Sequence, residues 1–244
     1  LECGEDVPDA IVSALDDCDD DLTVSLSAET IPQPCGYLLV RTWSTEDDCG
    51  NDVSESQTIT VVDTTPPSIT CPADVTLECG PGISTDPADT GTATGSDICG
   101  TVTISHLDAV TAGCGNTETI VRTWTATDEC GLETSCDQTI TVEDNTDPSI
   151  VCPPDVTGDC NDPTDPGDTG TATGSDDCGG VAISFNDVEI SGCANTIIIQ
   201  RTWTATDDCG NTASCLQTIS TGDGTAPDIT CPPDVTLECG PLTS

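Results

Sequence analysis

The chain has almost no positive charge and few large side chains. Its 244 residues include no lysine, three arginines and one histidine against 45 acidic residues, and its formal net charge is −42. This sign excludes nucleic acid as a partner, and anionic membrane surfaces with it, because both are negatively charged themselves. Aromatic residues make up only 2% of the chain, so they can fill only a small part of any core. No apolar run is long enough to cross a bilayer, and we expect no membrane insertion.

Motifs for catalysis and for transition-metal binding are missing as well. His106 is the single histidine, and no Cys-x-x-Cys pair, phosphate-binding glycine loop or metal-hydrolase motif occurs. Asp-Thr-Gly at 89–91 and again at 168–170 matches the catalytic triplet of aspartic proteases, but neither copy follows an apolar strand. We therefore expect that the chain is not an enzyme.

The sequence does contain a repeat with a period near 80 residues. The phrase RTWTATDECG at 122–131 returns as RTWTATDDCG at 201–210 and as RTWSTEDDCG at 41–50. This period is too long for helical solenoid repeats and is typical of small domains in tandem. We predict an N-terminally incomplete repeat 1 at 1–63, repeat 2 at 64–144, repeat 3 at 145–223 and the start of repeat 4 at 224–244.

Alternating apolar residues predict β-strands in each repeat. In repeat 2, Ile120, Arg122, Trp124 and Ala126 share one strand face. No helical apolar period occurs, so the predicted fold class is all-β: tandem immunoglobulin-like antiparallel β-sandwiches, stapled by disulfides. One tryptophan per repeat supplies much of the buried area, and an arginine two residues earlier lies along it. The predicted structural core residues are Arg41, Trp43, Arg122, Trp124, Arg201 and Trp203.

Eighteen cysteines recur in phase along the chain. This density in small repeats predicts an oxidising compartment, so we expect the chain to be extracellular or on the cell surface. Many pairings are possible. If successive strands run up and down the domain, Cys79 and Cys114 lie at one end of repeat 2 and its other four cysteines lie at the opposite end. The predicted disulfides are Cys3–Cys35, Cys18–Cys49, Cys71–Cys136, Cys79–Cys114, Cys99–Cys130, Cys152–Cys215, Cys160–Cys193 and Cys178–Cys209.

Two phrases in this pattern carry a family resemblance. PxITCPxDVTLECG, followed by TWTATDxCGNTxxCxQTITVxD, resembles the hyaline repeat (HYR) family, in the cysteine-rich form found in long secreted bacterial proteins. The resemblance covers the whole chain and implies immunoglobulin-like modules with a role in extracellular adhesion or surface architecture. Repeat 1 departs from the pattern, because Glu55 stands where repeat 2 has Cys136 and a DDCDDD run occupies 16–21.

Acidic residues concentrate where the predicted repeats meet. VEDNTDP at 142–148 resembles the junctions through which cadherin repeats hold calcium, an ion that takes about six to eight oxygen ligands. Aspartate is also favoured in turns, so a purely solvating role stays open. The candidate calcium ligands are Asp63, Glu143, Asp144, Asn145, Asp147 and Asp223 in the linkers, with Asp97, Asp128, Asp176 and Asp207 in loops beside cysteines.

These features predict a segment of an extracellular structural stalk or filament that is not catalytic. Disulfides would resist unfolding, short proline-bearing linkers would limit bending, and calcium would stiffen the junctions. The expected partner is the chain itself, in a tandem array or a filament. The alternative is an adhesin that binds a glycan or a surface protein through the repeats. It would require a concave or aromatic patch that differs between repeats.

Overall fold

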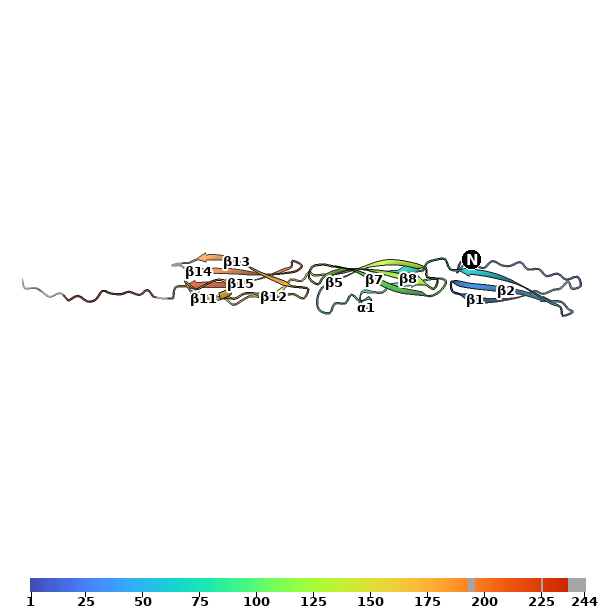
Figure 1. Ribbon diagram of the computed structural model, residues 1–244, viewed down its shortest axis with the longest axis horizontal. Coiled ribbons are helices and arrows are strands. Elements are labelled where there is room, and N and C mark those ends of the chain that lie inside the picture. Colours follow the sequence, from blue (N-terminus) through green and yellow to red (C-terminus); the bar gives the residue numbers. More distant parts are fainter. Residues whose placement is uncertain (193–195, 225, 237–244) are drawn as a thin grey trace, which may run out of the picture. The chain divides into compact units, whose positions relative to one another are not determined.

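The computed structural model describes residues 1–192, 196–224 and 226–236 (Figure 1). The chain divides into two compact units, Leu1–Asn145 and Thr146–Ser244. Unit 1 holds the predicted repeats 1 and 2, and unit 2 holds the predicted repeat 3. The all-β prediction is confirmed, because strands make up nearly all regular structure of the described residues, beside two four-residue helices.

Repeat 2 contains a four-stranded and a two-stranded sheet. The order of the large sheet is β5–β9–β8–β7, and the small sheet pairs β4 with β6. All neighbours are antiparallel except β5, which runs parallel to β9. Pro72 lies between β4 and β5, where a missing N–H ends a ladder. The elements are β4 (Ser68–Thr70), β5 (Val75–Glu78), α1 (Pro87–Thr90), β6 (Thr94–Ser96), β7 (Val102–Ala112), β8 (Glu118–Asp128) and β9 (Glu133–Glu143).

Trp124 lies in the core of repeat 2, on the inner face of β8. It is 3% exposed, and Ile140 on β9 is 0% exposed. The indole N–H of Trp124 donates to Gln138 Oε1 at 3.2 Å. The Gln138 amide in turn donates to the carbonyl oxygens of Ala73 and Thr90, at 3.0 and 2.8 Å. This buried amide therefore ties β9 to segments outside the large sheet.

Arg122 is also buried, at 2% exposure. Asp108 is its cross-strand neighbour on β7, and the guanidinium donates to both carboxylate oxygens of Asp108, at 2.7 and 2.8 Å. It donates further to Thr90 Oγ1 and to the carbonyl oxygen of Thr85. The hydrogen bond from Arg122 holds the pKa of Asp108 below its usual range. The arginine is thus neutralised inside the fold, and every described contact it makes is structural.

Repeat 3, in unit 2, has the same arrangement. Arg201 pairs with Asp187 at 2.8 Å, and the indole of Trp203 donates to Gln217 at 3.1 Å. The sheet orders are β11–β15–β14–β13 and β10–β12. The elements are β10 (Ser149–Val151), β11 (Val156–Asp159), α2 (Pro166–Thr169), β12 (Thr173–Ser175), β13 (Val181–Ser191), β14 (Ile197–Asp207) and β15 (Thr212–Gly222).

Repeat 1 has a single three-stranded sheet of β1 (Ser25–Gln33), β2 (Gly36–Glu46) and β3 (Asp52–Val62). Ala28 stands opposite Arg41, where the other repeats have an aspartate, and Arg41 donates to the carbonyl oxygen of Pro8 at 2.8 Å instead. Trp43 is only half-buried. Arg41 and Trp43 are therefore more exposed than their counterparts in the other repeats, because residues 10–24 form no second sheet over them.

Two disulfides within a repeat match the pairs predicted from the sequence. Cys71 is bonded to Cys136 and Cys152 to Cys215, with Cα–Cα distances of 6.0 and 5.9 Å, and both are predicted pairs. The first bond ties the end of β4 to β9 and so joins the two sheets of repeat 2. Cys79, Cys114, Cys178 and Cys209 are also disulfide-bonded. The predicted pair Cys160–Cys193 includes a residue outside the described part of the chain.

Three predicted pairs are wrong in this structure. Cys3 is bonded to Cys99, so neither Cys3–Cys35 nor Cys99–Cys130 is formed. Cys99 and Cys130 do lie at the same end of repeat 2, but their loops face repeat 1. Cys99 is therefore bonded to Cys3 of repeat 1 instead of to Cys130. Cys18 and Cys49 are exposed thiols rather than a pair. They occupy the positions of Cys99 and Cys130 in their own repeat, which do not pair with each other either.

Candidate functional site at the junction of repeats 1 and 2

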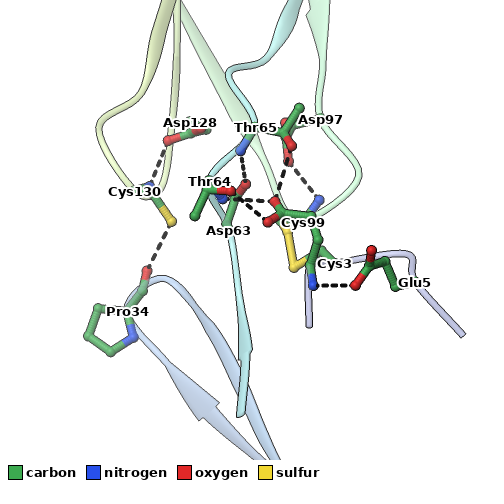
Figure 2. The surroundings of a disulfide bond; sticks show 11 residues. Cys3, Glu5, Pro34, Asp63, Thr64, Thr65, Asp97, Cys99, Asp128 and Cys130 are labelled. Carbon is green, nitrogen blue, oxygen red and sulfur yellow. Dashed lines mark hydrogen bonds between the residues drawn. A yellow bond between two sulfur atoms is a disulfide. The ribbon is translucent and has the colours of Figure 1, made fainter. Parts of the chain in front are cut away.

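The junction of repeats 1 and 2 lies within unit 1 and is built from five short segments (Figure 2). They are the first residues of the chain, the linker at 63–67, the loop around Cys99, the turn between β8 and β9, and the turn between β1 and β2. The Cys3–Cys99 disulfide joins the first and third segments, with a Cα–Cα distance of 5.5 Å. Gly4 follows with φ of 81°, and a side chain there would collide with Ile98. The positive φ therefore favours a glycine beside the bond.

Glu2 fastens the linker. Its carboxylate accepts the backbone N–H of Thr64 at 2.8 Å, the Thr64 hydroxyl at 2.7 Å and the Thr65 hydroxyl at 3.1 Å. The N–H of Thr64 is the main reason why the pKa of Glu2 lies below its usual range. At the other end of repeat 2, Glu78 accepts the N–H of Asn145 at 2.7 Å. Both glutamates belong to the recurring phrase LECG, a signal of this role that the sequence prediction missed.

Two buried aspartates lie close together beside Glu2. Asp63 and Asp128 are 8% and 7% exposed. One oxygen of each lies within 4.8 Å of the other and of Cys130 Sγ. Glu2 and Asp63 form an overlapping group of the same kind with Cys99, whose sulfur is in the disulfide. We call Glu2, Asp63 and Asp128 the junction carboxylates. They come from both repeats, so the group exists only when the repeats are in contact.

Asp128 has an unpaired oxygen at this site. Its Oδ1 accepts the N–H groups of Cys130 and Leu132, at 2.8 and 2.9 Å. Its Oδ2 is buried and has no hydrogen-bond partner among the described residues. Leaving a buried acceptor unpaired costs about 1–3 kcal/mol, and more when the group is charged. The oxygen is therefore available to a cation.

The cause of this unpaired oxygen is one residue of the turn motif Asp-x-Cys-Gly-Asn. In repeat 3 the Asn211 amide donates to Asp207 Oδ2 at 2.9 Å, and in repeat 1 the Asn51 amide donates to Asp47 Oδ2 at 2.7 Å. Repeat 2 has Leu132 at this position, which cannot donate. The sequence contained this difference, but its meaning depends on the burial of Asp128.

The remaining candidate ligands have other surroundings. Asp97 and Asp176 each accept the N–H of the cysteine two residues later, at 2.6 and 2.7 Å. Both oxygens of Asp207 are occupied by its own turn, so it offers no free ligand atom. Asp144 is half-buried. Glu143, Asn145, Asp147 and Asp223 are exposed. Within unit 1, the structure therefore brings together Asp63 and Asp128 from the predicted set, and adds Glu2.

Comparison with known proteins places the chain in no family. No family model matches it and no curated protein matches it, so the hyaline repeat resemblance remains a prediction. Within the described residues, no helix is long and apolar enough to span a bilayer.

Among solved structures, the chain is similar to cadherin ectodomains at low identity. The protocadherin GammaB4 extracellular domain shows 12% identity and a TM-score of 0.32, over 83% of this chain and 45% of that one. Drosophila N-cadherin EC1-4 shows 12% identity and a TM-score of 0.34, over 79% and 59%. The chain thus spans about half the length of these two proteins. Similarity at this level does not establish a shared family, and the function is argued below from this chain's own residues.

Proposed function

We propose that this chain is a non-catalytic segment of an extracellular stalk or filament, in which neighbouring repeats are locked at their junctions. The Cys3–Cys99 disulfide carries the proposal, because it joins two repeats rather than two strands of one repeat. A bond in this place adds little to the fold of either repeat. Its effect is to limit their relative motion, which is what a stiff array requires. The density of disulfides favours an extracellular location.

Calcium binding at the junction carboxylates is the second part of the proposal. Glu2, Asp63 and Asp128 supply the oxygen ligands that calcium prefers, and Asp128 Oδ2 lacks any other partner among the described residues. Backbone carbonyls and water would complete the coordination. Bound calcium would offset the repulsion between two buried carboxylates and connect the linker to repeat 2. The residues present therefore fit the ion.

The locking role is tested by measuring whether repeats 1 and 2 tumble together. ¹⁵N relaxation of the full chain should give one rotational diffusion tensor for both repeats when the disulfide is intact. Both proteins carry Cys130→Ser, so that Cys3–Cys99 is the bond under test, and replacing Cys3 and Cys99 by serine as well should give each repeat its own shorter correlation time. Identical relaxation in the two proteins would refute the locking role. Cys49→Ser, which removes an exposed thiol of repeat 1, is the matched control.

The calcium role is tested by calorimetric melting of the full chain with its disulfides intact. Calcium should raise the melting temperature until the site is saturated, and Asp63→Asn should remove most of that rise. Glu29→Gln, which changes an exposed carboxylate on β1, should leave the rise unchanged. An equal response in all three proteins would mean that the acidic residues are only solvating.

A second candidate function rests on a cavity that differs between repeats. Trp43 lines a cavity of about 370 Å³ in repeat 1, together with Val12 and Leu15 and with Asp47 and Asp52 at its polar side. Trp124 and Trp203 are buried in their own repeats. An accessible aromatic face beside carboxylates suits a sugar ring. Isothermal titration calorimetry with glycans tests this adhesin role, and binding that survives Trp43→Leu would exclude this cavity.

A further inference from the structure

A second pair of cysteines meets across the same junction. Cys35 lies in the turn between β1 and β2, at the end of repeat 1 that faces repeat 2. Cys130 lies in the turn between β8 and β9. The Sγ atom of Cys130 is 4.0 Å from the carbonyl oxygen of Pro34, the residue directly before Cys35 (Figure 2). Both side chains are thiols in the structure.

We propose that Cys35 and Cys130 form a second disulfide across the junction, beside Cys3–Cys99. The partners that the sequence predicted for them, Cys3 and Cys99, are bonded to each other. That leaves each of the two thiols facing the other. The inference builds on the proposed locking role, but its test detects the bond itself and not the stiffness of the junction.

Repeat equivalence supports the pair independently. Cys114 occupies the position of Cys35 in repeat 2, in the turn between β7 and β8, and Cys209 occupies the position of Cys130 in repeat 3. Both of these cysteines are disulfide-bonded. Disulfide bonding at these two turn positions therefore occurs elsewhere in the chain, although Cys49, at the position of Cys130 in repeat 1, is a thiol.

The surroundings of Cys130 agree with a close thiol pair. Hydrogen bonding with the Cys35 thiol raises the pKa of Cys130 to about 12, with burial and Asp63 acting in the same direction. Cys130 is half-buried and already lies against the turn that carries Cys35, so it is the less accessible of the two thiols. Cys35 is exposed and can be reached by an oxidant.

The oxidation balances with a low-molecular-weight disulfide, such as oxidised glutathione, as the oxidant. The Cys35 thiolate attacks the oxidant, forms a mixed disulfide and releases one small thiol. The Cys130 sulfur then loses its proton to water, attacks the Cys35 sulfur and releases the second small thiol. Two protein thiols are oxidised, one disulfide is reduced to two thiols, and one S–S bond forms for each one broken.

A second bond would change both the mechanics and the chemistry of the junction. The linker at 63–67 and the Cys3–Cys99 disulfide already connect the two repeats at two points, and a third covalent connection would further limit their bending and twisting. Oxidation would also remove the thiol beside Asp63 and Asp128. The cluster would then present carboxylate oxygens without a soft thiolate ligand, which suits calcium rather than zinc.

Peptide mapping of the full chain tests the proposal. The protein is oxidised with the glutathione couple, its remaining thiols are alkylated in denaturant, and it is cleaved after glutamate without reduction. Cleavage places Cys35 in TIPQPCGYLLVRTWSTE at 30–46 and Cys130 in CGLE at 130–133, apart from all other cysteines. We expect one species with the summed mass of these peptides less two hydrogens, which separates into them on reduction.

The mapping is read in protein whose Cys3 is linked to Cys99, so that the junction is known to be formed. Alkylation of both Cys35 and Cys130 in that protein would overturn the proposal, as would a link from either one to another cysteine. In Cys130→Ser, Cys35 should become alkylated. Cys49→Ser, the matched control at the equivalent turn of repeat 1, should leave the linked species in place.

Discussion

Leu132→Asn should stabilise the turn that carries Asp128. In repeat 3 the corresponding amide of Asn211 donates to Asp207 Oδ2 at 2.9 Å, and Asp128 Oδ2 lacks that donor. A hydrogen bond to a charged group contributes about 1.5–3 kcal/mol. Removing a half-buried leucine costs about 1 kcal/mol. We therefore expect a net gain of about 1 kcal/mol in local stability.

Amide hydrogen exchange measures this gain directly. The N–H of residue 132 donates to Asp128 Oδ1, so its exchange reports opening of the turn. With a chelator present, exchange at residue 132 should slow by about fivefold in Leu132→Asn, since about 1.4 kcal/mol corresponds to a factor of ten. Asn211→Leu is the converse change in repeat 3, and exchange at residue 211 should become about fivefold faster.

Calcium should reverse the relative stability of the Leu132→Asn variant and the unchanged chain. The new amide occupies the oxygen that we assign to the ion, so Leu132→Asn should bind calcium more weakly than the unchanged chain. Two results would refute the reasoning. One is unchanged exchange in both variants with chelator present, which would mean that the unpaired oxygen has no energetic consequence. The other is unchanged calcium affinity in Leu132→Asn, which would exclude Asp128 Oδ2 as a ligand.

Three further predictions concern the core and the junction. Arg122 lowers the pKa of Asp108 in the folded chain. The pair's contribution to stability is therefore complete above the unfolded pKa of about 4 and is lost as the pH falls through the folded pKa. Asp108→Asn should make the melting temperature depend less on pH in the acid range. Gly4→Ala should destabilise the junction by about 1–2 kcal/mol, because φ is 81° and an alanine is strained there, and a lower yield of the Cys3–Cys99 peptide would reveal it. Gln138→Leu should destabilise repeat 2 by at least about 3 kcal/mol in urea unfolding, because an indole N–H and two carbonyls lose their buried partner.

Much of the fold was predictable from the sequence for a local reason. Alternation of apolar residues over Ile120, Trp124 and Ile140 sets which face of each strand is buried, and the tertiary structure buries that face. The ion-pair partner of Arg122 was harder to predict from the sequence. Asp108 is its neighbour only through the β7–β8 register, which the turn between the strands decides.

The disulfide pairing shows more clearly where prediction from the sequence fails. The strand directions correctly placed Cys99 and Cys130 at one end of repeat 2. An in-phase cysteine pattern, however, looks the same whether a cysteine pairs within its own repeat or with the next one. Cys3 and Cys99 are separated by 96 residues, and only contact between two folded repeats distinguishes these alternatives.

By itself, then, the sequence determined the tandem organisation, the all-β class and the acidic character of the junctions, because these follow from period, alternation and composition. The tertiary structure decided which groups meet there: Cys3 with Cys99, Asp63 with Asp128, and Cys130 with the turn that carries Cys35. The physical reason is that each of these groups belongs to a different segment, and their proximity depends on how one repeat packs against the next.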